Sequence, residues 1–260
     1  MDTTYFRGSA VKRYFRETGE VWLFARRFFR EAVRRPFEWK ELLNQCFIVG
    51  NQSLFLVAMT GLIMGLVLTL QTRPTMEDFG AEAYMPAMVG VSIIREIGPV
   101  IIALICAGKI GSSIGAELGS MKVTEQIAAM EVSGTNPFKY LVVTRILATT
   151  LMVPLLVIFG DAIALFGSYL VENMKGDVSF RLFFNKVFRQ LSFADLMPAT
   201  IKTFFFGFAI GLIGCYKGYN SKKGTAGVGR AANTAVVVAS MLLFVLDFIA
   251  VLVADIFFDL

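Results

Sequence analysis

Long apolar stretches dominate the chain after residue 45, and each is long enough to cross a lipid bilayer. Ile48–Leu70 is the clearest, with 23 residues and no charged side chain. A helix needs roughly 20 apolar residues to cross the hydrocarbon core. The same criterion predicts helical spans at about 48–70, 85–114, 141–171, 196–216 and 231–254. The pattern therefore predicts an all-α integral membrane protein with about five transmembrane helices.

Residues 1–45 precede these spans and are strongly basic, with ten Lys/Arg against six Asp/Glu. Within them, 21–35 has apolar side chains at helical spacing (Trp22, Ala25, Phe29, Val33), while most of its arginines fall elsewhere on the helical wheel. This pattern is typical of a helix that lies in the headgroup layer. A solvated charged helix or a nucleic-acid-binding segment would have a similar composition, but the adjacent span favours the membrane interface. We therefore divide the chain into a basic interfacial region, 1–45, and a membrane domain, 46–260.

The distribution of basic residues predicts the orientation. With the N-terminus inside the cell, the inner segments carry 18 Lys/Arg and the outer segments carry five. The acidic residues Asp255 and Asp259 then fall outside. Because basic residues concentrate on the cytoplasmic side of membrane proteins, we expect the N-terminus inside and the C-terminus outside.

The composition limits the kinds of catalytic and metal-binding site that the chain can form. The chain is 56% hydrophobic, with a mean hydropathy of +0.65, and it contains no histidine, the commonest general base and metal ligand. No catalytic residue and no metal site are expected, and Cys46, Cys106 and Cys215 are interpreted as separate buried thiols. Four sets of small residues at four-residue spacing favour close helix packing, in a compact bundle with a second copy: Gly61/Gly65, Gly111/Gly115/Gly119, Gly207/Gly211 and Gly214/Gly218.

Four ionisable side chains fall inside these predicted spans: Arg95, Glu96, Lys202 and Asp247. A charge at the centre of a bilayer costs roughly 2.5–3.5 kcal/mol, so such residues face one another or a wet cavity. Two are basic and two are acidic, so we expect a neutral cluster between packed helices. Asp161 is a further acid in the third span, and the sequence suggests no partner for it.

A polar segment between the second and third spans can form a short helix. Thr124 can cap it, Glu125 falls in its first turn, and Gly134 and Pro137 can end it. Ile127, Met130 and Glu131 could then fit a groove on a soluble partner, although a plain connecting loop explains the composition equally well.

The glycines of 224–231 have a spacing similar to that of a phosphate-binding loop. The segment lacks the Lys and Ser/Thr that hold phosphate and Mg²⁺, and it follows no strand. We interpret it as a flexible cytoplasmic turn, not a nucleotide site.

The run REIGPVIIALICAGKIGSSIGAELGSMKVTEQIAAMEVSGTNP, residues 95–137, resembles the signature of the MlaE/YrbE permease family. The likeness extends to the basic N-terminal helix and to IKTFFFGFAIGLIGCYKGY, GTAGVGRAANTAVV and LDFIAVL. Members of this family are membrane subunits of ABC transporters that move lipids together with MCE-domain proteins.

This resemblance implies a homodimeric permease in the bacterial inner membrane that helps to maintain the lipid asymmetry of the outer membrane. It would bind two ATPase subunits, which carry ATP and Mg²⁺, and a periplasmic ring of MCE-domain protein, with phospholipid as substrate and no cofactor in this chain. Segment 123–132 would be the coupling helix that contacts the ATPase, through Glu125, Ile127, Met130 and Glu131.

The resemblance also implies a lipid cavity above the charged cluster of Arg95, Glu96, Lys202 and Asp247. Its expected lining is Leu68, Thr75, Met76, Phe79 and Ile97. Each of these alone is better explained by ordinary packing, and the expectation applies to the five as a set. The cluster is either structural or responsive to the transport cycle, and its balanced charges favour a structural role.

The residues alone, without the resemblance, are compatible with two other classes of function. An ion-coupled secondary transporter or a channel could use the same charges as a relay and would need no ATPase. A membrane-embedded lipid-modifying enzyme has little support, because the chain has no histidine and no Ser, Cys or Asp pair at catalytic spacing.

Overall fold

The computed structural model describes residues 3–34, 37–176, 178–222 and 224–258. Arg35 and Lys223, which are among the 18 inner basic residues counted above, and Asp259 lie outside this part of the chain. The described residues form helices and contain five helical segments long and apolar enough to cross a membrane: Trp39–Asp78, Glu82–Val123, Phe138–Gly176, Phe193–Tyr219 and Thr225–Phe257. The predicted all-α fold with about five spans is confirmed.

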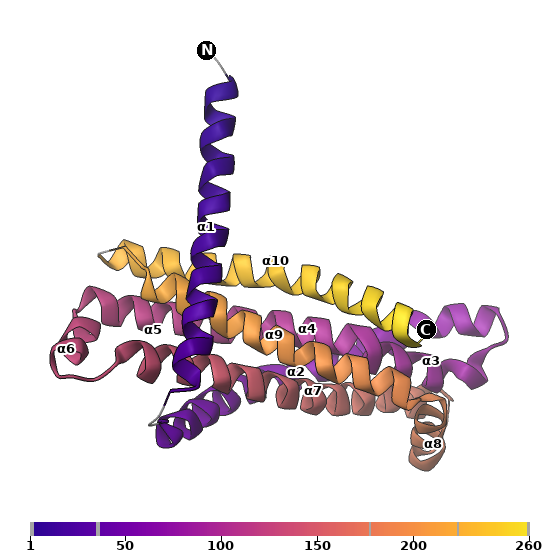
Figure 1. The fold of residues 1–260 in the computed structure, drawn as a ribbon. Coiled ribbons are helices and arrows are strands. Elements are labelled where there is room, and N and C mark those ends of the chain that lie inside the picture. The colour runs from indigo at the N-terminus through magenta and orange to yellow at the C-terminus, as the bar shows by residue number, and fades with distance from the viewer. Residues whose placement is uncertain (1–2, 35–36, 177, 223, 259–260) are drawn as a thin grey trace.

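The N-terminal helix α1 (Thr3–Ala32) is longer than predicted. It runs across the bundle, and its N-terminal part extends beyond the other helices (Figure 1). Its protein-facing side is formed by Phe24 and Phe28, which are buried against aromatic rings such as Phe138 and Phe208. Trp22 and Phe29 stay exposed, at 73% and 60%. An apolar face left uncovered on a helix that crosses a membrane bundle is the arrangement expected of an interfacial helix.

The first span, α2 (Trp39–Asp78), begins earlier than the predicted span 48–70 and continues past its predicted end. The second span is a chain of shorter pieces: η1 (Glu82–Tyr84), α3 (Met85–Ser92), η2 (Ile93–Ile97), α4 (Gly98–Cys106), η3 (Ala107–Gly111) and α5 (Ser112–Val123). Of these, η2 and η3 are π-helical turns, each with a wider backbone loop than an α-helical turn. Such turns inside a helix are frequent at functional sites.

The remaining elements are α6 (Gln126–Val132), the π-helical η4 (Phe138–Val143), α7 (Thr144–Gly176), α8 (Phe180–Gln190), α9 (Phe193–Tyr219) and α10 (Thr225–Phe258). Figure 1 shows α6 at one end of the bundle and α8 at the other, beside the C-terminus. We refer to these as the α6 end and the α8 end. Helix α8 lies between the third and fourth predicted spans, where no helix was predicted. The expected flexible turn was wrong, because α10 begins inside it at Thr225.

Glycines bring the helices of this one chain into close contact. A Cβ atom at Gly65 would lie 1.8 Å from the carbonyl oxygen of Ala164, and one at Gly207 would lie 2.5 Å from that of Thr149. Gly115 and Gly218 face α10 and α5 in the same way. The expected compact bundle is therefore present, but the glycine sets pack within the chain and do not by themselves require a second copy.

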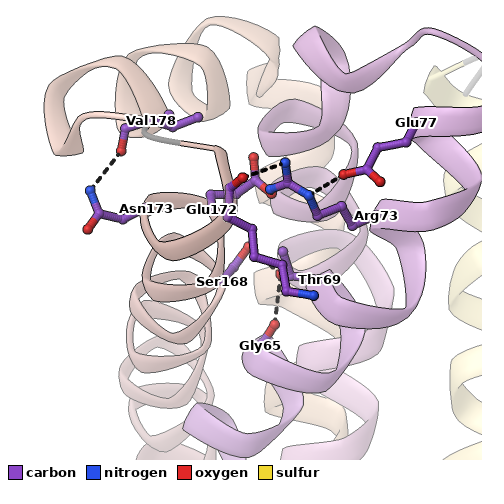
Figure 2. Close-up of polar contacts among 9 residues, drawn as sticks. Gly65, Thr69, Arg73, Glu77, Ser168, Glu172, Asn173 and Val178 are labelled. Carbon is purple, nitrogen blue, oxygen red and sulfur yellow. Dashed lines mark hydrogen bonds and ion pairs between the residues drawn. The ribbon is translucent and has the colours of Figure 1, made fainter.

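Polar contacts join α2 to α7 near the α8 end (Figure 2). Thr69 donates a hydrogen bond of 2.7 Å to Ser168. One turn further along α2, Arg73 lies between Glu77 and Glu172 and also donates to the carbonyl oxygen of Lys175. These partners satisfy the guanidinium of Arg73, a residue that is 9% exposed, and α2 remains helical through Pro74 to Asp78.

Candidate functional site

Lys202 is the centre of a charged cluster buried between three spans. Its side chain is 4% exposed, and its Nζ donates hydrogen bonds to Glu96 at 2.6 Å and to Asp247 at 2.9 Å. Glu96 belongs to η2, Lys202 to α9 and Asp247 to α10. Three of the four predicted intramembrane charges therefore meet, and one ammonium group holds three helices together.

The π-helical turn η2 presents Arg95 and Glu96 to this region. Pro99 has no backbone N–H, so it cannot donate to the carbonyl oxygen of Arg95 as an α-helical residue would. The backbone instead forms a wider turn in which the Gly98 N–H donates to the carbonyl oxygen of Ile93. This local widening places two charged side chains within a span that is otherwise apolar.

Arg95 does not join the Lys202 cluster, contrary to the expectation that the four charges pair with one another. Its guanidinium lies 3.6 Å from the carboxylate of Asp195, which also accepts hydrogen bonds from Ser192 at the start of α9. Sequence reasoning missed Asp195 because it placed that residue just before the fourth span. The Ser192-x-x-Asp195 capping pattern was the available signal, since it marks the first turn of α9.

Two cavities border Lys202. The smaller, about 120 Å³, is polar on one side, where Arg95, Glu96 and Asp195 line it. The larger, about 340 Å³, is an apolar groove between α9 and α10. The groove is lined by Pro198, Ile201, Phe205, Leu246, Ile249 and Val253, among others. Lys202 thus lies at a boundary between a polar and an apolar space, which suits an amphipathic ligand.

The five residues expected to line a lipid cavity do not form one site in the single chain. Leu68 and Met76 pack against the buried cluster around Met85 and Phe183 at the α8 end. Thr75 and Phe79 are exposed on the last turns of α2, and Ile97 is half-buried in η2, next to Glu96. None of the five lines either cavity beside Lys202. Their role in lipid binding stays a prediction.

The short helix α6 is present at the expected position, but its cap and its buried face differ from the prediction. The Thr124 hydroxyl donates to the carbonyl oxygen of Ser120 in α5, and Glu125 precedes α6 in the left-handed conformation, with φ of 60°. Gly134 ends the helix as predicted, because its φ of 79° lets two backbone N–H groups return to Met130 and Glu131.

Ile127 was expected to face a partner, but it is 2% exposed and belongs to the core of this chain. Met130 packs against the same core and is half-buried. Because Ile127 and Met130 are three residues apart, they share the face of α6 that packs inward. The exposed face is formed by Glu125, Ala128, Glu131 and Val132, and Val132 is 90% exposed.

The α6 segment is connected to α1. Asn136, just after α6, donates to Glu31 at 3.1 Å, and the guanidinium of Arg27 lies 4.1 Å from the centre of the Phe138 ring. The Lys139 ammonium also donates to the carbonyl oxygen of Arg34. The N-terminal segment and the loop that follows α6 are therefore joined by several polar contacts.

Sequence comparison places these features in a family. The family model described as Permease MlaE matches residues 42–253, which contain three of the five apolar spans completely and most of the first and the last. The chain belongs to the MlaE permease family.

Relatives in this family cover nearly the whole chain. A probable ABC transporter permease protein of Rickettsia felis is 37% identical over 251 residues, 96% of each chain. The intermembrane phospholipid transport system permease protein MlaE of Haemophilus influenzae is 33% identical over 245 residues, 93% of each chain. A probable ABC transporter permease protein of Pyropia yezoensis is 34% identical over 227 residues, 86% of each chain. As an MlaE-family permease with five apolar spans, the protein is a multi-pass membrane protein.

Proposed function

We propose that this chain is the membrane subunit of an ABC transporter that moves phospholipid between the inner membrane and a periplasmic ring of MCE-domain protein. Such transport would help to maintain the lipid asymmetry of the outer membrane. The observation that carries the proposal is the family match over residues 42–253, together with 33% identity to a phospholipid-transport permease over 93% of the chain. In this proposal the α6 end is cytoplasmic and the α8 end is periplasmic.

Two copies of the chain form the membrane part of the transporter. One face of α10 is apolar and exposed in the single chain, including Met241, Phe244 and Phe248. A second copy packed near this face would separate the apolar groove between α9 and α10 from the surrounding membrane lipid. The lipid cavity, with Leu68, Thr75, Met76, Phe79 and Ile97 as its proposed lining, then needs both copies to be complete.

A cysteine crosslink tests the position of the second copy. Phe248→Cys on α10 should form a disulfide between two copies in native membranes, whereas Leu155→Cys, on α7 and also exposed, should not. Equal crosslinking at both positions would place the contact elsewhere.

A separate ATPase supplies the energy, and α6 transmits its movement. The exposed residues Glu125 and Glu131 would contact the ATPase, while Ile127 and Met130 fasten α6 to the membrane domain. The packing of α6 into the core supports this role, because a movement of the ATPase would then be transmitted through α6 to the membrane spans. Glu31 and Asn136 extend the same connection to α1.

The charged cluster has a structural role in this proposal. Lys202 neutralises part of the charge of Glu96 and Asp247 and keeps η2, α9 and α10 together beneath the lipid cavity. Its position beside the apolar groove supports a site where the floor of the cavity is polar and its walls are apolar.

Reconstitution tests the function directly. The full chain, purified with its ATPase and MCE partners in vesicles that contain a fluorescent phospholipid, should transfer this lipid to the MCE protein only when ATP is added. Glu131→Lys should reduce this transfer and the retention of the ATPase, whereas Lys222→Met, on an exposed loop, should change neither. Lipid movement by the chain alone under an ion gradient would overturn the proposal in favour of a secondary transporter.

A further inference from the structure

Helix α8 carries a ridge of phenylalanine rings beside a ridge of polar side chains. The rings recur every four residues, with centroid distances of 4.5 Å between Phe180 and Phe184 and 6.1 Å between Phe184 and Phe188. The residue after each ring belongs to the polar ridge, which consists of Arg181, Asn185 and Arg189. The helix has three basic side chains and no acidic one. This aromatic and cationic surface is typical of a helix that contacts anionic lipid.

The opposite side of α8 is packed into the bundle, so the two ridges stay uncovered. Phe183 and Val187 are fully buried. Phe188 is 64% exposed, and Arg189 is exposed and has no ion-pair partner among the described residues. The third span ends at Gly176 and the fourth begins at Phe193, so α8 lies where the chain leaves and re-enters the apolar layer (Figure 1). The exposed ridges are therefore close to the level of the lipid headgroups.

A groove beside α8 runs between α7 and α9, and we call it the α7–α9 groove. It has a volume of about 210 Å³, and Leu165, Phe188 and Leu196 line it near α8. Val157 and Thr203 line it further from α8. Because Val157 and Leu165 are eight residues apart on one helix, the groove follows α7 for about 12 Å. Its long direction is that of the spans, and therefore also that of the acyl chains in a bilayer.

The α7–α9 groove is mostly apolar and open to the side of the bundle. Its rim includes Ile158, Ala162 and Leu196, which are exposed. The Thr203 hydroxyl donates to a backbone carbonyl, so it needs no polar ligand. Asp161 also lines the groove, but it lies one turn further from α8 than Leu165 and is therefore distant from the basic ridge. An acyl chain fits such a groove, and its headgroup would lie beside α8.

The α7–α9 groove faces away from the groove beside Lys202. On α9, positions 196, 199, 200 and 203 line the first, whereas positions 198, 201, 202 and 205 line the second. The two sets are offset by two residues, or about 200° around the helix, so they lie on opposite faces of α9. A second copy packed near α10 would leave the α7–α9 groove in contact with the surrounding bilayer.

We propose that the α7–α9 groove and α8 together bind one anionic phospholipid of the surrounding bilayer. One acyl chain lies along the groove against Phe188, and Arg189, the next residue, contacts the phosphate. The bound lipid fills the space between α7 and α9 and neutralises part of the charge of α8. It is distinct from a transported lipid, so the site does not depend on the proposed transport function.

Tryptophan fluorescence next to the groove tests the preference for an anionic lipid. The full chain would carry Phe188→Trp as reporter, with Trp22→Phe and Trp39→Phe to remove the natural signals, in vesicles of phosphatidylcholine and phosphatidylglycerol. Either lipid would be brominated on its acyl chains, because bromine quenches a neighbouring indole. Brominated phosphatidylglycerol should quench the reporter with a relative binding constant about threefold higher, as expected for an ion pair at an exposed position. A Leu151→Trp reporter, exposed on α7 outside the groove, should show no preference.

Two substitutions in the reporter chain separate the headgroup contact from the groove. Arg189→Gln should abolish the preference, whereas Arg189→Lys should retain most of it and Lys222→Gln, far from α8, all of it. Ala162→Phe should fill the groove and also abolish the preference without a change of charge. Leu151→Phe, on the same face of α7 about 16 Å away, is its control. If Ala162→Phe does not fold, Thr200→Leu on the α9 side of the groove replaces it.

Three results would overturn the proposal. The first is equal quenching of the Phe188→Trp reporter by the two brominated lipids. The second is loss of the preference in only one of Arg189→Gln and Ala162→Phe, or in neither, since the headgroup and the acyl chain would then not share this site. The third is a disulfide between two copies of a Phe188→Cys chain in membranes, because a second copy would then cover the groove. These measurements need no ATPase and no lipid transfer, so a failure here leaves the proposed transport function standing.

Discussion

The ammonium of Lys202 lies 2.6 Å from the carboxylate of Glu96, although 106 positions separate the two residues in the sequence. Asp247 binds the same ammonium from a third helix, at 2.9 Å. One cation therefore closes a contact among the second, fourth and fifth spans, and each carboxylate depends on it. The cluster is more sensitive to the loss of Lys202 than to the loss of either acid, because only Lys202 has two partners.

Replacement of Lys202 by methionine should destabilise the protein strongly. The change keeps the length of the side chain but leaves Glu96 and Asp247 without their counter-charge. Removal of one partner from a buried ion pair costs about 3–5 kcal/mol, and the lower part of that range applies here because the Glu96 side chain is 40% exposed. The free energy of unfolding in detergent measures the effect.

Two further variants make this prediction specific. Lys222→Met, at an exposed position, should leave stability unchanged. The triple variant Lys202→Met/Glu96→Gln/Asp247→Asn should recover part of the loss, because no uncompensated charge remains. A Lys202→Met protein as stable as Lys222→Met would contradict the role of the cluster as a structural tie.

A methyl group at Gly65 should force α2 away from α7. A Cβ atom there would lie 1.8 Å from the carbonyl oxygen of Ala164, which is backbone and cannot rotate away. Overpacking of this kind costs about 1–3 kcal/mol. Gly65→Ala should therefore lower the unfolding temperature, whereas Gly229→Ala should not, because nothing lies within 4 Å of a Cβ atom at that helical position. Equal effects of the two variants would show that the α2–α7 contact is not tight.

The spans were predictable because a bilayer fixes the minimum length of an apolar helix. The ends of the spans were not predictable, because they depend on contacts between residues that are far apart in the sequence. Arg73 looks like a loop residue beside Pro74, yet Glu77 and Glu172 satisfy it and keep α2 helical. The glycine-rich segment 224–231 likewise has the composition of a turn, but α10 begins inside it at Thr225, and Gly227 packs tightly against the backbone of Lys222.

The candidate site was only partly visible in the sequence for a similar reason. Charges inside apolar spans identified Lys202, Glu96 and Asp247, since burial makes such residues pair. The partner of Arg95 could not be found in this way, because Asp195 lies at a helix start, where an acid is ordinary. The inward face of α6 was also hidden, since a seven-residue helix is too short for its periodicity to show which side is covered.

Arg73 should be required to keep the α8 end of α2 ordered. Arg73→Ala removes the contact with Glu172, which is then left buried without a counter-charge, at a cost of about 3–5 kcal/mol. Hydrogen exchange followed by mass spectrometry should show faster exchange across residues 70–79, the segment that carries Thr75, Met76 and Phe79. Arg181→Ala, an exposed arginine on α8, serves as the control and should leave exchange in this segment unchanged.

Substitutions on the buried and the exposed face of α6 should affect different properties, namely the stability of the chain and its binding of the ATPase. Ile127→Ala removes a side chain that is 2% exposed, so it should lower the stability of the isolated chain by roughly 2–5 kcal/mol. Glu131→Ala changes an exposed residue and should leave that stability within error. When the chain is purified with its ATPase, however, Glu131→Ala should retain less ATPase than the wild type, because a contact carboxylate is lost.

Comparison of the two variants separates attachment from recognition. Unfolding of the isolated chain reports how α6 is held to the membrane domain, while the amount of ATPase that copurifies reports what its outer face contacts. If Glu131→Ala keeps a full complement of ATPase, and Glu125→Ala does as well, then the exposed face of α6 is not the binding surface. The ATPase would in that case have to bind elsewhere at the α6 end, and the rigid packing of Ile127 would serve the stability of the bundle alone.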